Sequence, residues 1–458
     1  MAKPSLPQGT RDFGPDIVRK RNYILDTIKN VFELYGFQPL ETPAMENLDT
    51  LMGKYGEEGD KLIFKILNNG LDNPAKEKQA REDFEKVLQG KNNSGITERA
   101  LKYDLTIPFA RYVAMNHAQL SFPFKRYQVQ PVWRADRPQR GRYREFYQCD
   151  ADVVGSNALL NEIELTNIYA TVFDRLKINT EIKINSRKIL QALAETCGAT
   201  AKMTDITTAI DKMDKIGLEK VKEELTGRGL DDKQVGIIDQ YLTIARYSGN
   251  NDTILSELEK LFGENEHGIT GLKELRTILD NTSNLAFSSK VYIDPTLARG
   301  LNYYTGTIFE VSSPGVKIGS IGGGGRYDDL TGLFGVPNIP GVGISFGVDR
   351  IYDVMEELNL FPANVYIGTQ VLFFNLGEAE SRAAFGLLQQ LRTKGIRGEL
   401  FHESSKFDKQ FKYAEKKNIP FIIIIGDKEL KENTCTIKNL GTGQQETIAS
   451  DKLIAYNF

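Results

Sequence analysis

The segments FKRYQVQPVWRAD (residues 124–136) and GRYREFYQCDADVVG (residues 141–155) predict two strands joined by a short loop. Successive side chains of a strand point to opposite faces of a sheet, so residues at even positions share one face. That face is mostly polar or charged. It carries Arg126, Gln128, Gln130, Val132 and Arg134 in the first strand, and Arg142, Arg144, Phe146, Gln148, Asp150 and Asp152 in the second. The opposite face of the second strand is apolar, with Tyr147, Cys149, Ala151 and Val153.

The polar face of this hairpin has two interpretations. A solvated outer face is the usual meaning of such alternation. A binding surface is favoured by the residue types, because arginine makes paired hydrogen bonds to phosphates and carboxylates. Residues 125–145 contain seven Lys or Arg against two acidic residues, and the loop ADRPQRG is itself basic. This local charge is typical of a surface that faces phosphate groups.

The composition limits the class of protein. The chain has 458 residues, enough for two or three domains, with 40% hydrophobic and 26% charged residues. Its longest strongly apolar run, FIIIIG near residue 421, is far too short for a membrane span, and the N-terminus lacks the apolar region of a secretory signal. Three scattered cysteines and three scattered histidines favour neither disulfides nor a metal site. These features predict a cytoplasmic protein without a membrane segment.

The order of sequence patterns indicates several parts. Apolar residues at helical spacing predict a helix over 17–36, which Gly36 ends. Residues 68–100 are polar and suggest an exposed insertion, and helical periods dominate from about 186 to 280. Strand patterns return at 290–347. Beyond about residue 365, strands alternate with helices near 378–394 and 406–417, which predicts a small α/β unit.

Three further segments are rich in glycine. SIGGGGRYDDL at 320–330 allows either close backbone approach to a ligand or a flexible turn. GVGISFGVDRI at 341–351 runs from a strand into a helix, and Arg350 near the helix start suits an anionic or aromatic partner, unless it simply lies at the surface. LARGLNYYTG at 297–306 places an arginine and two tyrosines where a buried strand would have Val or Ile.

Together these segments resemble the class II aminoacyl-tRNA synthetases, and within them the histidyl-tRNA synthetases. LETPAMEN at 40–47 is similar to motif 1 of the class, the hairpin to motif 2 and GVGISFGVDRI to motif 3. LARGLNYYTG and GGGGRYDDL resemble two signatures peculiar to the histidyl enzymes, and KYDLT at 102–106 resembles their segment for the substrate amine. One departure is Asn302, where the family commonly has Asp.

The resemblance implies an α/β protein of three parts. These are a class II catalytic domain with an antiparallel sheet over 1–180 and 281–360, a helical insertion over 181–280, and an α/β anticodon-binding domain over 365–458. It also implies a homodimer formed through motif 1. The implied reaction joins L-histidine to ATP, giving histidyl-adenylate, and then transfers histidine to the 3′ end of tRNA(His). ATP is a substrate that brings Mg²⁺, and no organic cofactor or protein metal site is expected.

The resemblance also implies roles for single residues. Arg134 and Arg299 are expected to be catalytic, Arg299 taking the place of a metal ion in other class II enzymes, although it could instead form a structural salt bridge. Histidine would be bound by Asp104, Thr106, Arg134, Gln148, Asp152, Arg299, Tyr303 and Tyr304. ATP would be bound by Arg134, Arg142 and Arg350, and the tRNA acceptor end by Arg137 and Gln139.

Two other functions are known for proteins with a related fold. Regulatory relatives reuse the histidyl-synthetase fold in histidine biosynthesis, but they lack the C-terminal unit and often lose the motif arginines. A module that senses uncharged tRNA would be fused to a kinase or another large domain. The chain retains Arg134, Arg299 and Arg350 and has the unit after residue 365, which favours the synthetase.

Overall fold

The computed structural model describes residues 3–247, 249–282, 289–298, 303–366 and 368–458. The chain divides into two compact units. One consists of Met1–Asp12 with Arg21–Leu360, and the other of Phe13–Lys20 with Phe361–Phe458. Among the described residues, no helix combines the length and the apolar character needed to cross a bilayer.

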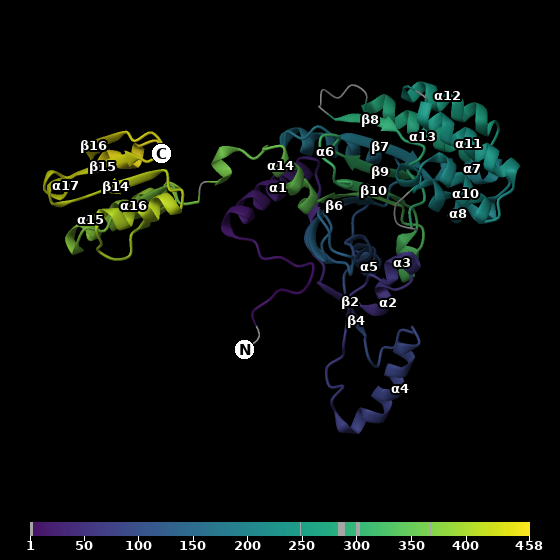
Figure 1. Ribbon diagram of the computed structural model, residues 1–458, viewed down its shortest axis with the longest axis horizontal. Coiled ribbons are helices and arrows are strands. Elements are labelled where there is room, and N and C mark those ends of the chain that lie inside the picture. The colour runs from purple at the N-terminus through teal and green to yellow at the C-terminus, as the bar shows by residue number, and fades with distance from the viewer. Residues whose placement is uncertain (1–2, 248, 283–288, 299–302, 367) are drawn as a thin grey trace. The chain divides into compact units, whose positions relative to one another are not determined.

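An eight-stranded sheet forms the centre of the larger unit (Figure 1). Its strand order is β1-β5-β6-β11-β10-β9-β7-β8. The inner neighbours are antiparallel, and only the edge pairs β1–β5 and β7–β8 are parallel. In this order the strands are β1 (Gln38–Pro39), β5 (Phe124–Trp133), β6 (Glu145–Val154), β11 (Gly341–Gly347), β10 (Gly322–Tyr327), β9 (Thr307–Ser312), β7 (Glu181–Ser186) and β8 (Lys290–Ile293). The predicted hairpin and the predicted antiparallel sheet are confirmed.

The two faces of the hairpin differ as the alternation predicts. Register pairs Arg126 with Asp152 and Gln128 with Asp150, so these side chains share a face. On the opposite face Cys149, Ala151 and Val153 are 0% exposed, and this face is covered by α1 (Pro15–Leu34) and α6 (Leu160–Arg175). There Phe346 of β11 is the shared contact: its ring centroid lies 5.8 Å from that of Phe32, 4.8 Å from that of Tyr169 and 5.5 Å from that of Phe173. Helices on one face leave the other face for the site.

The stretch expected as a helical insertion over 181–280 begins with a strand. Glu181–Ser186 form β7 of the central sheet and pair with β9 along their whole length. Helices follow from Arg187 to Thr282. They are α7 (Arg187–Thr196), α8 (Met203–Ile210), α9 (Met213–Ile216), α10 (Leu218–Gly227), α11 (Asp232–Tyr247), α12 (Asn251–Phe262) and α13 (Glu266–Thr282). The Tyr241 hydroxyl of α11 donates to the Pro295 carbonyl at 2.8 Å, so this bundle contacts the segment that leads towards residue 299.

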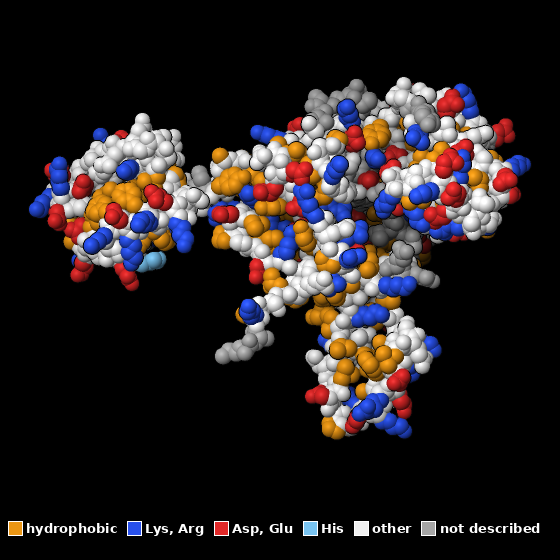
Figure 2. All heavy atoms as spheres, in the orientation of Figure 1, with side chains coloured by type: hydrophobic (Ala, Val, Ile, Leu, Met, Phe, Trp, Pro, Cys, Tyr) orange, Lys and Arg blue, Asp and Glu red, His pale blue; other side chains and the backbone are white. Residues whose placement is uncertain are grey.

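A small sheet carries the insertion expected at 68–100. Its order is β2 (Met45–Asn47), β4 (Arg99–Leu101) and β3 (Lys65–Ile66). Between β3 and β4 lies α4 (Glu77–Leu88), which projects from the sheet in Figure 1. Figure 2 shows hydrophobic side chains gathered on this projection, where Leu67, Phe84 and Leu88 are exposed. The nearby helices are α2 (Leu48–Leu51), α3 (Gly56–Asp60) and α5 (Thr106–Asn116).

The C-terminal unit has the predicted alternation of strands and helices. Its five-stranded sheet has the order β13-β12-β14-β15-β16, with β12 parallel to β13 and β14. The strands are β12 (Val371–Phe373), β13 (Gly398–Leu400), β14 (Phe421–Ile424), β15 (Thr434–Asn439) and β16 (Gln445–Ala449). The helices are α15 (Glu378–Thr393), α16 (Phe407–Lys416) and α17 (Asp427–Glu432). The chain reaches this unit after α14 (Val348–Glu357) of the larger one.

Candidate active site

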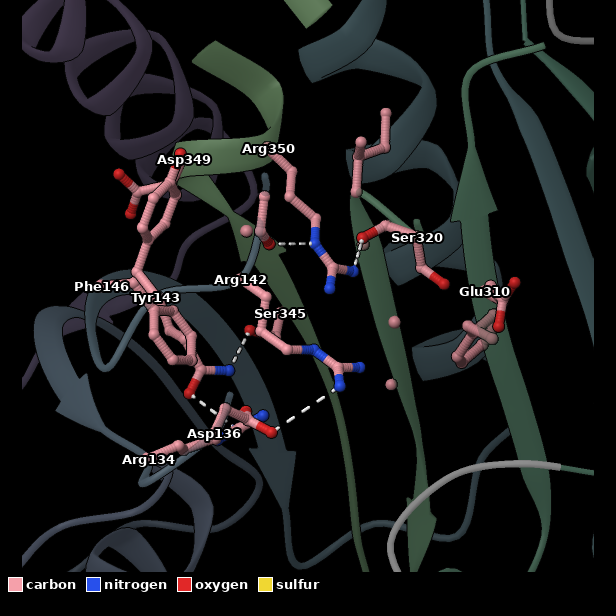
Figure 3. A pocket seen from close by; sticks show the side chains of 18 of the residues that line it. Arg134, Asp136, Arg142, Tyr143, Phe146, Glu310, Ser320, Ser345, Asp349 and Arg350 are labelled. Carbon is pink, nitrogen blue, oxygen red and sulfur yellow. Dashed lines mark hydrogen bonds and ion pairs between the residues drawn. The ribbon is translucent and has the colours of Figure 1, made fainter. Parts of the chain in front are cut away.

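A cavity of about 350 Å³ opens on the polar face of the central sheet (Figure 3). Its walls are β6, β9, β10, β11, the loop between β5 and β6, and the start of α14. Five residues with predicted roles line it: Arg134, Arg142, Gln148, Tyr304 and Arg350. The wall also includes Asp136, Tyr143, Phe146, Glu310, Ser345 and Asp349. The sheet thus brings together residues that lie more than 200 positions apart in the sequence.

Arg134 is oriented at the end of the hairpin by several contacts. Its Nε donates to the Tyr103 carbonyl at 3.0 Å, and its Nη2 donates to Gln148 Oε1 at 3.4 Å. The guanidinium also lies over the rings of Tyr103 and Phe146, 4.3 and 5.2 Å from their centroids. Gln148 is fixed in turn by donating to Ser345 Oγ at 2.8 Å. A guanidinium has five N–H donors, so these contacts leave Arg134 able to hold an anion.

Arg350 forms another side of the cavity. Its Nε donates to the Gly141 carbonyl and its Nη1 to the Ser320 carbonyl, both at 2.7 Å. Burial lowers the pKa of Arg350, and the nearby charges of Arg142 and Arg134 act in the same direction. Arg350 is therefore a part-buried residue of the cavity wall. Three arginines converge on the wall and suit a polyanion such as a triphosphate, and three carboxylates, those of Asp136, Glu310 and Asp349, share the wall with them.

The four glycines form strand β10, which excludes the flexible turn. A Cβ on Gly324 would lie 2.2 Å from the Gly343 carbonyl oxygen, and one on Gly325 would lie 2.9 Å from the ring of Tyr304. A Cβ on Gly343 would come within 2.0 Å of Asp152 Oδ1. Side chains at these positions would therefore displace neighbouring backbone and site residues.

Asp152 belongs to a buried polar cluster beside the cavity. Its Oδ1 accepts from the Tyr327 hydroxyl at 2.5 Å, and its Oδ2 lies 2.9 Å from Arg126 Nη2. Arg126 is 0% exposed, although it lies on the face that could have been solvated. Burial raises the pKa of Asp152, while Arg126 opposes the rise. Burial raises the pKa of Asp150 as well, again opposed by Arg126 and reinforced by Asp152.

Asp104 forms a second polar group, at the start of α5. Its Oδ1 accepts from the Tyr55 hydroxyl at 2.9 Å and from the Ile107 amide at 3.2 Å, and its Oδ2 accepts from the Tyr303 hydroxyl at 3.1 Å. Burial raises the pKa of Asp104, and these hydrogen bonds and Arg134 oppose the rise. Thr106 is the first residue of α5. The Tyr303 ring lies 5.1 Å from that of Tyr304, which joins this group to the cavity.

Several buried polar atoms near these groups have no hydrogen-bond partner among the described residues. They are Arg126 Nε and Nη1, Gln128 Oε1 and Asp150 Oδ1. Buried polar groups are almost always hydrogen-bonded, and an unsatisfied one costs roughly 1–3 kcal/mol. Donors and acceptors left together on the polar face need further partners, which water or a small polar ligand can supply. The solvated-face interpretation of the hairpin is wrong, because other strands and loops bury this end of it.

The hairpin loop and the 299 segment complete the list of predicted residues. Arg137 and Gln139 are exposed and do not line the cavity. The Gln139 amide donates to the Arg142 carbonyl at 3.0 Å and the reverse bond measures 2.9 Å, so the loop ends in a tight turn. Arg299 and Asn302 lie outside the described residues. The role predicted for Arg299 stays a prediction.

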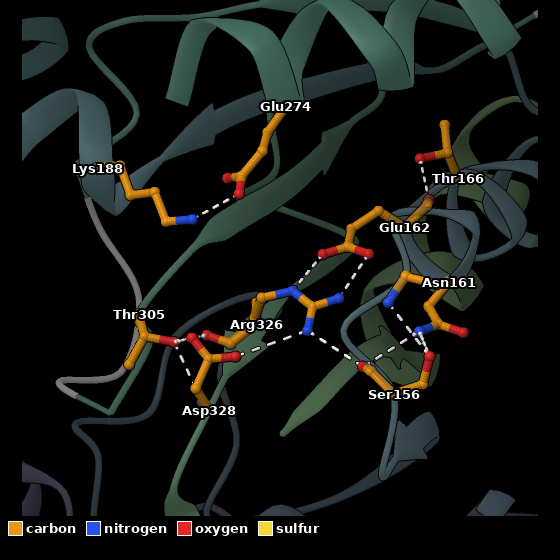
Figure 4. Close-up of polar contacts among 10 residues, drawn as sticks. Ser156, Asn161, Glu162, Thr166, Lys188, Glu274, Thr305, Arg326 and Asp328 are labelled. Carbon is orange, nitrogen blue, oxygen red and sulfur yellow. Dashed lines mark hydrogen bonds and ion pairs between the residues drawn. The ribbon is translucent and has the colours of Figure 1, made fainter. Parts of the chain in front are cut away.

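A second buried ion pair supports the segment after residue 302 (Figure 4). Arg326 donates to both oxygens of Glu162, at 2.5 and 2.8 Å, in the paired geometry of a guanidinium and a carboxylate. Beyond it, the Thr305 hydroxyl donates to Asp328 Oδ2 at 2.6 Å, and the Thr305 amide donates to the Arg326 carbonyl at 2.8 Å. These contacts fix the chain just after Tyr303 and Tyr304.

The residues that were not predicted from the sequence include three that hold or flank predicted ones. Tyr55 and Tyr327 hold the carboxylates of Asp104 and Asp152, and Asp349 lines the cavity. Tyr327 lies in the GGGGRYDDL segment and Asp349 in GVGISFGVDRI, so the resemblance of these segments to family motifs could have indicated both residues. Tyr55 had no such signal, because it comes from a segment without recognisable periodicity.

Comparison with known proteins identifies the family. The family model described as histidyl-tRNA synthetase matches residues 75–351, and one described as anticodon binding domain matches residues 370–456. The chain belongs to the histidyl-tRNA synthetase family. A histidine–tRNA ligase of Bacteroides fragilis is 51% identical over 455 residues, which cover 99% of this chain and 98% of the relative. One of Flavobacterium johnsoniae is 50% identical, covering 98% and 97%.

Solved structures agree with this family. The crystal structure of a histidyl-tRNA synthetase from Nostoc is 32% identical, with a TM-score of 0.82 and 99% of each chain covered. A structure titled as an ATP phosphoribosyltransferase regulatory subunit or histidyl-tRNA synthetase, from Bacillus halodurans, has a TM-score of 0.72. At 19% identity that likeness concerns the fold alone. The class II fold predicted from the sequence is confirmed.

Proposed function

We propose that the cavity and the polar clusters beside it bind ATP and L-histidine, and that the chain joins histidine to tRNA(His) in two steps. The chain is an ATP-dependent ligase of the histidyl-tRNA synthetase family. The observation that carries the residue assignments is the arginine-lined cavity next to buried, unsatisfied donors and acceptors. A triphosphate suits the arginine-lined cavity. An imidazole, with one donor and one acceptor nitrogen, suits the unsatisfied donors and acceptors beside it.

In the first step the carboxylate of histidine attacks the α-phosphate of ATP, and pyrophosphate leaves. Arg134 lines the cavity and contacts the Tyr103 carbonyl and Gln148, so its charge would offset the charge that develops on the α-phosphate. Arg142 would hold the outer phosphates. Arg350 would hold the adenine or the γ-phosphate. Arg299 is proposed to act beside Arg134 as a fixed cation in place of a metal ion.

Histidine recognition is assigned to the polar groups. Asp152 is proposed to accept a hydrogen bond from the imidazole, with Tyr304 as the second ring contact. Asp104 and Thr106 would hold the ammonium group, and Gln148 the carboxylate end. Tyr303, which donates to Asp104, would line the same pocket and keep that carboxylate in place.

Magnesium is proposed to enter bound to ATP. Among the described residues, no group of three or more His, Cys, Asp or Glu is arranged to hold a metal ion. Glu310 and Asp136 line the cavity and are oxygen donors of the kind Mg²⁺ prefers, so they fit an ion that is held mainly by phosphates. The ion would supply charge neutralisation on the pyrophosphate.

The remaining parts are assigned to tRNA and to assembly. The C-terminal unit is proposed to bind the anticodon over residues 365–458, the helical insertion within 181–280 to contact the acceptor arm, and the loop residues Arg137 and Gln139 to read the acceptor end. We propose a cytoplasmic homodimer formed through residues 40–47. Sedimentation should then give about twice the chain mass of 51.4 kDa, and a monomer at micromolar concentration would contradict it.

Charging of a tRNA(His) transcript with labelled histidine tests this function. The wild-type chain should form histidyl-tRNA, and Arg134→Ala should lose activity by about 10²–10³, the effect of one lost transition-state contact. Arg175→Ala, an exposed arginine at the end of α6, is the matched control and should stay active. A wild-type chain that forms no histidyl-tRNA, or an unaffected Arg134→Ala, would contradict the proposal.

A further inference from the structure

A short N-terminal segment, Pro7–Arg11, lies against the loop that joins β5 to β6. We call it the N-terminal clasp. The backbone amide of Arg144, at the end of that loop, donates to the Gly9 carbonyl at 2.9 Å, and its Nη1 donates to the Gln8 carbonyl at 3.4 Å. The clasp is closed on itself by Thr10, whose hydroxyl and amide both donate to the Pro7 carbonyl, at 2.8 and 3.1 Å.

Arg11 connects the clasp to the wall of the cavity. Its guanidinium carbon lies 3.2 Å from the centroid of the Tyr143 ring, a cation–π contact. Its Nη2 lies 2.5 Å from Asp349 Oδ1, which also binds Arg21 of α1 at 2.5 Å. Tyr143 and Asp349 both line the cavity, whereas Arg11 does not. Arg11 therefore contacts the loop and the start of α14 without lining the cavity.

The opposite side of the same loop is held by Arg350, which donates to the Gly141 carbonyl. Gly141 has a φ of +69°, and a Cβ there would come 3.2 Å from Ile318 and 3.3 Å from Arg350. The loop is thus held at Gly141 from the cavity and at Tyr143 and Arg144 from the clasp. Between the ends of the two strands, Arg137 and Gln139 remain exposed.

Gly9 is required by the geometry of the clasp. Its φ is +84°, a region that disfavours residues with a side chain. A Cβ on Gly9 would lie 2.8 Å from Arg144 Cγ and 2.9 Å from Pro138 Cγ. Any larger residue at position 9 would therefore push the clasp away from the loop. Gly14 offers a matched control, because a Cβ there meets no atom within 4 Å and its φ is not positive.

We propose that the N-terminal clasp positions the β5–β6 loop for the acceptor end of tRNA, and that Arg11 and Gly9 are positioning residues for the transfer step. The inference rests on the proposed function for the tRNA contact. On the cavity side the loop is held by the bond from Arg350 to the Gly141 carbonyl, which involves no residue of the clasp. Losing the clasp should thus loosen the loop at Tyr143 and Arg144 while Arg350 still holds Gly141.

Loop order can be measured directly in the full chain. Trypsin cleaves after Arg140, which is exposed within the loop, and protection there reports how firmly the loop is held. The sole tryptophan of the chain, Trp133, is a second reporter. It lies where β5 enters the loop, and its Nε1 donates to Glu145 Oε2 at 2.7 Å, where β6 leaves it. Neither the trypsin cleavage nor the Trp133 fluorescence requires a bound substrate.

Gly9→Ala and Arg11→Ala should speed trypsin cleavage after Arg140 and change the Trp133 emission. Both should lower kcat/KM for tRNA about 10- to 100-fold, the usual effect of misplacing a binding group. Histidine-dependent pyrophosphate exchange should fall far less, and Gly14→Ala should match the wild type in every reading. Arg11→Lys should restore part of the protection, because it keeps the charge beside Asp349.

Unchanged cleavage and unchanged charging in Gly9→Ala and Arg11→Ala would overturn the proposal. Equal losses of exchange and charging, together with a lower melting temperature, would also overturn it, since they would give the clasp a role in stability alone. A wild-type chain that charges no tRNA would instead contradict the proposed function, and the trypsin reading would still decide whether the clasp orders the loop.

Discussion

Asp152→Asn removes the charge from the proposed imidazole contact while changing the shape of the side chain very little. Asp152 is 2% exposed and receives hydrogen bonds or charge from Tyr327 and Arg126. Tyr327 and Arg126 hold the two carboxylate oxygens, and Gly343 leaves the space that the side chain fills. The asparagine should therefore occupy the same place, with its carbonyl towards Arg126 and its amide towards the Tyr327 oxygen.

Two losses follow from this single change. The charge-assisted contact with Arg126 becomes a neutral one, which should cost roughly 1.5–3 kcal/mol of folding free energy. The imidazole likewise loses an ionised acceptor, at about 1–3 kcal/mol, or roughly 5- to 150-fold in kcat/KM for histidine. ATP affinity should change little, since Asp152 does not line the cavity.

Calorimetric titration with histidine, pyrophosphate exchange at varied histidine and a thermal melt measure these effects separately. Asp205→Asn is the matched control: it removes the same charge from a 2.6 Å pair with Arg228 in the helical bundle, far along the chain from the site. A folded Asp152→Asn protein with unchanged histidine affinity and unchanged exchange would remove Asp152 from the pocket. Equal weakening of ATP and histidine would show a general disturbance of the sheet.

Further predictions concern other parts of the chain. Arg299→Ala should fold normally yet lose about 10²–10³ in exchange rate, measured beside a thermal melt; near-normal exchange would make it structural. Gln139→Ala should lower tRNA charging and leave exchange intact, whereas equal losses would refute its role in reading the acceptor end. Burial raises the pKa of Asp150 to about 7 from 3.8, so the unfolded state binds fewer protons than the folded state between these values, and stability should fall as the pH rises through them. Denaturant titrations of Asp150→Asn should show a shallower slope, and the buried Asp152 and Asp104 should account for the slope that remains. Ending the chain after residue 364 should weaken charging but spare exchange, and loss of exchange in a folded truncation would show coupling between the units.

The hairpin shows how far periodicity reaches. Alternation correctly placed Arg126, Gln128, Asp150 and Asp152 on one face, because side chains of a strand alternate whatever surrounds it. The alternation alone does not show whether that face is exposed to solvent or buried. That outcome depends on segments distant in the sequence, such as the one carrying Asp104, which close over the sheet.

The contacts around Asp349 illustrate what sequence patterns miss. Its two arginine partners lie 338 and 328 positions away, and nothing local in the sequence marks them. The glycine run was a better signal. Because glycines have no Cβ atoms, the run predicted that another group lies close to this backbone. In the structure the neighbouring strands lie close to it, and glycines of the run also line the cavity. Local rules thus found many of the elements, the family resemblance supplied the predicted roles of single residues, and the partners that orient those residues required the fold.

Histidine-dependent exchange of pyrophosphate into ATP, run in parallel with each of the other standard amino acids, tests the central claim most directly. The account predicts exchange with histidine alone, since the buried clusters offer an imidazole both acceptors and donors. No exchange with histidine, or comparable exchange with another amino acid, would contradict the assignment of this pocket.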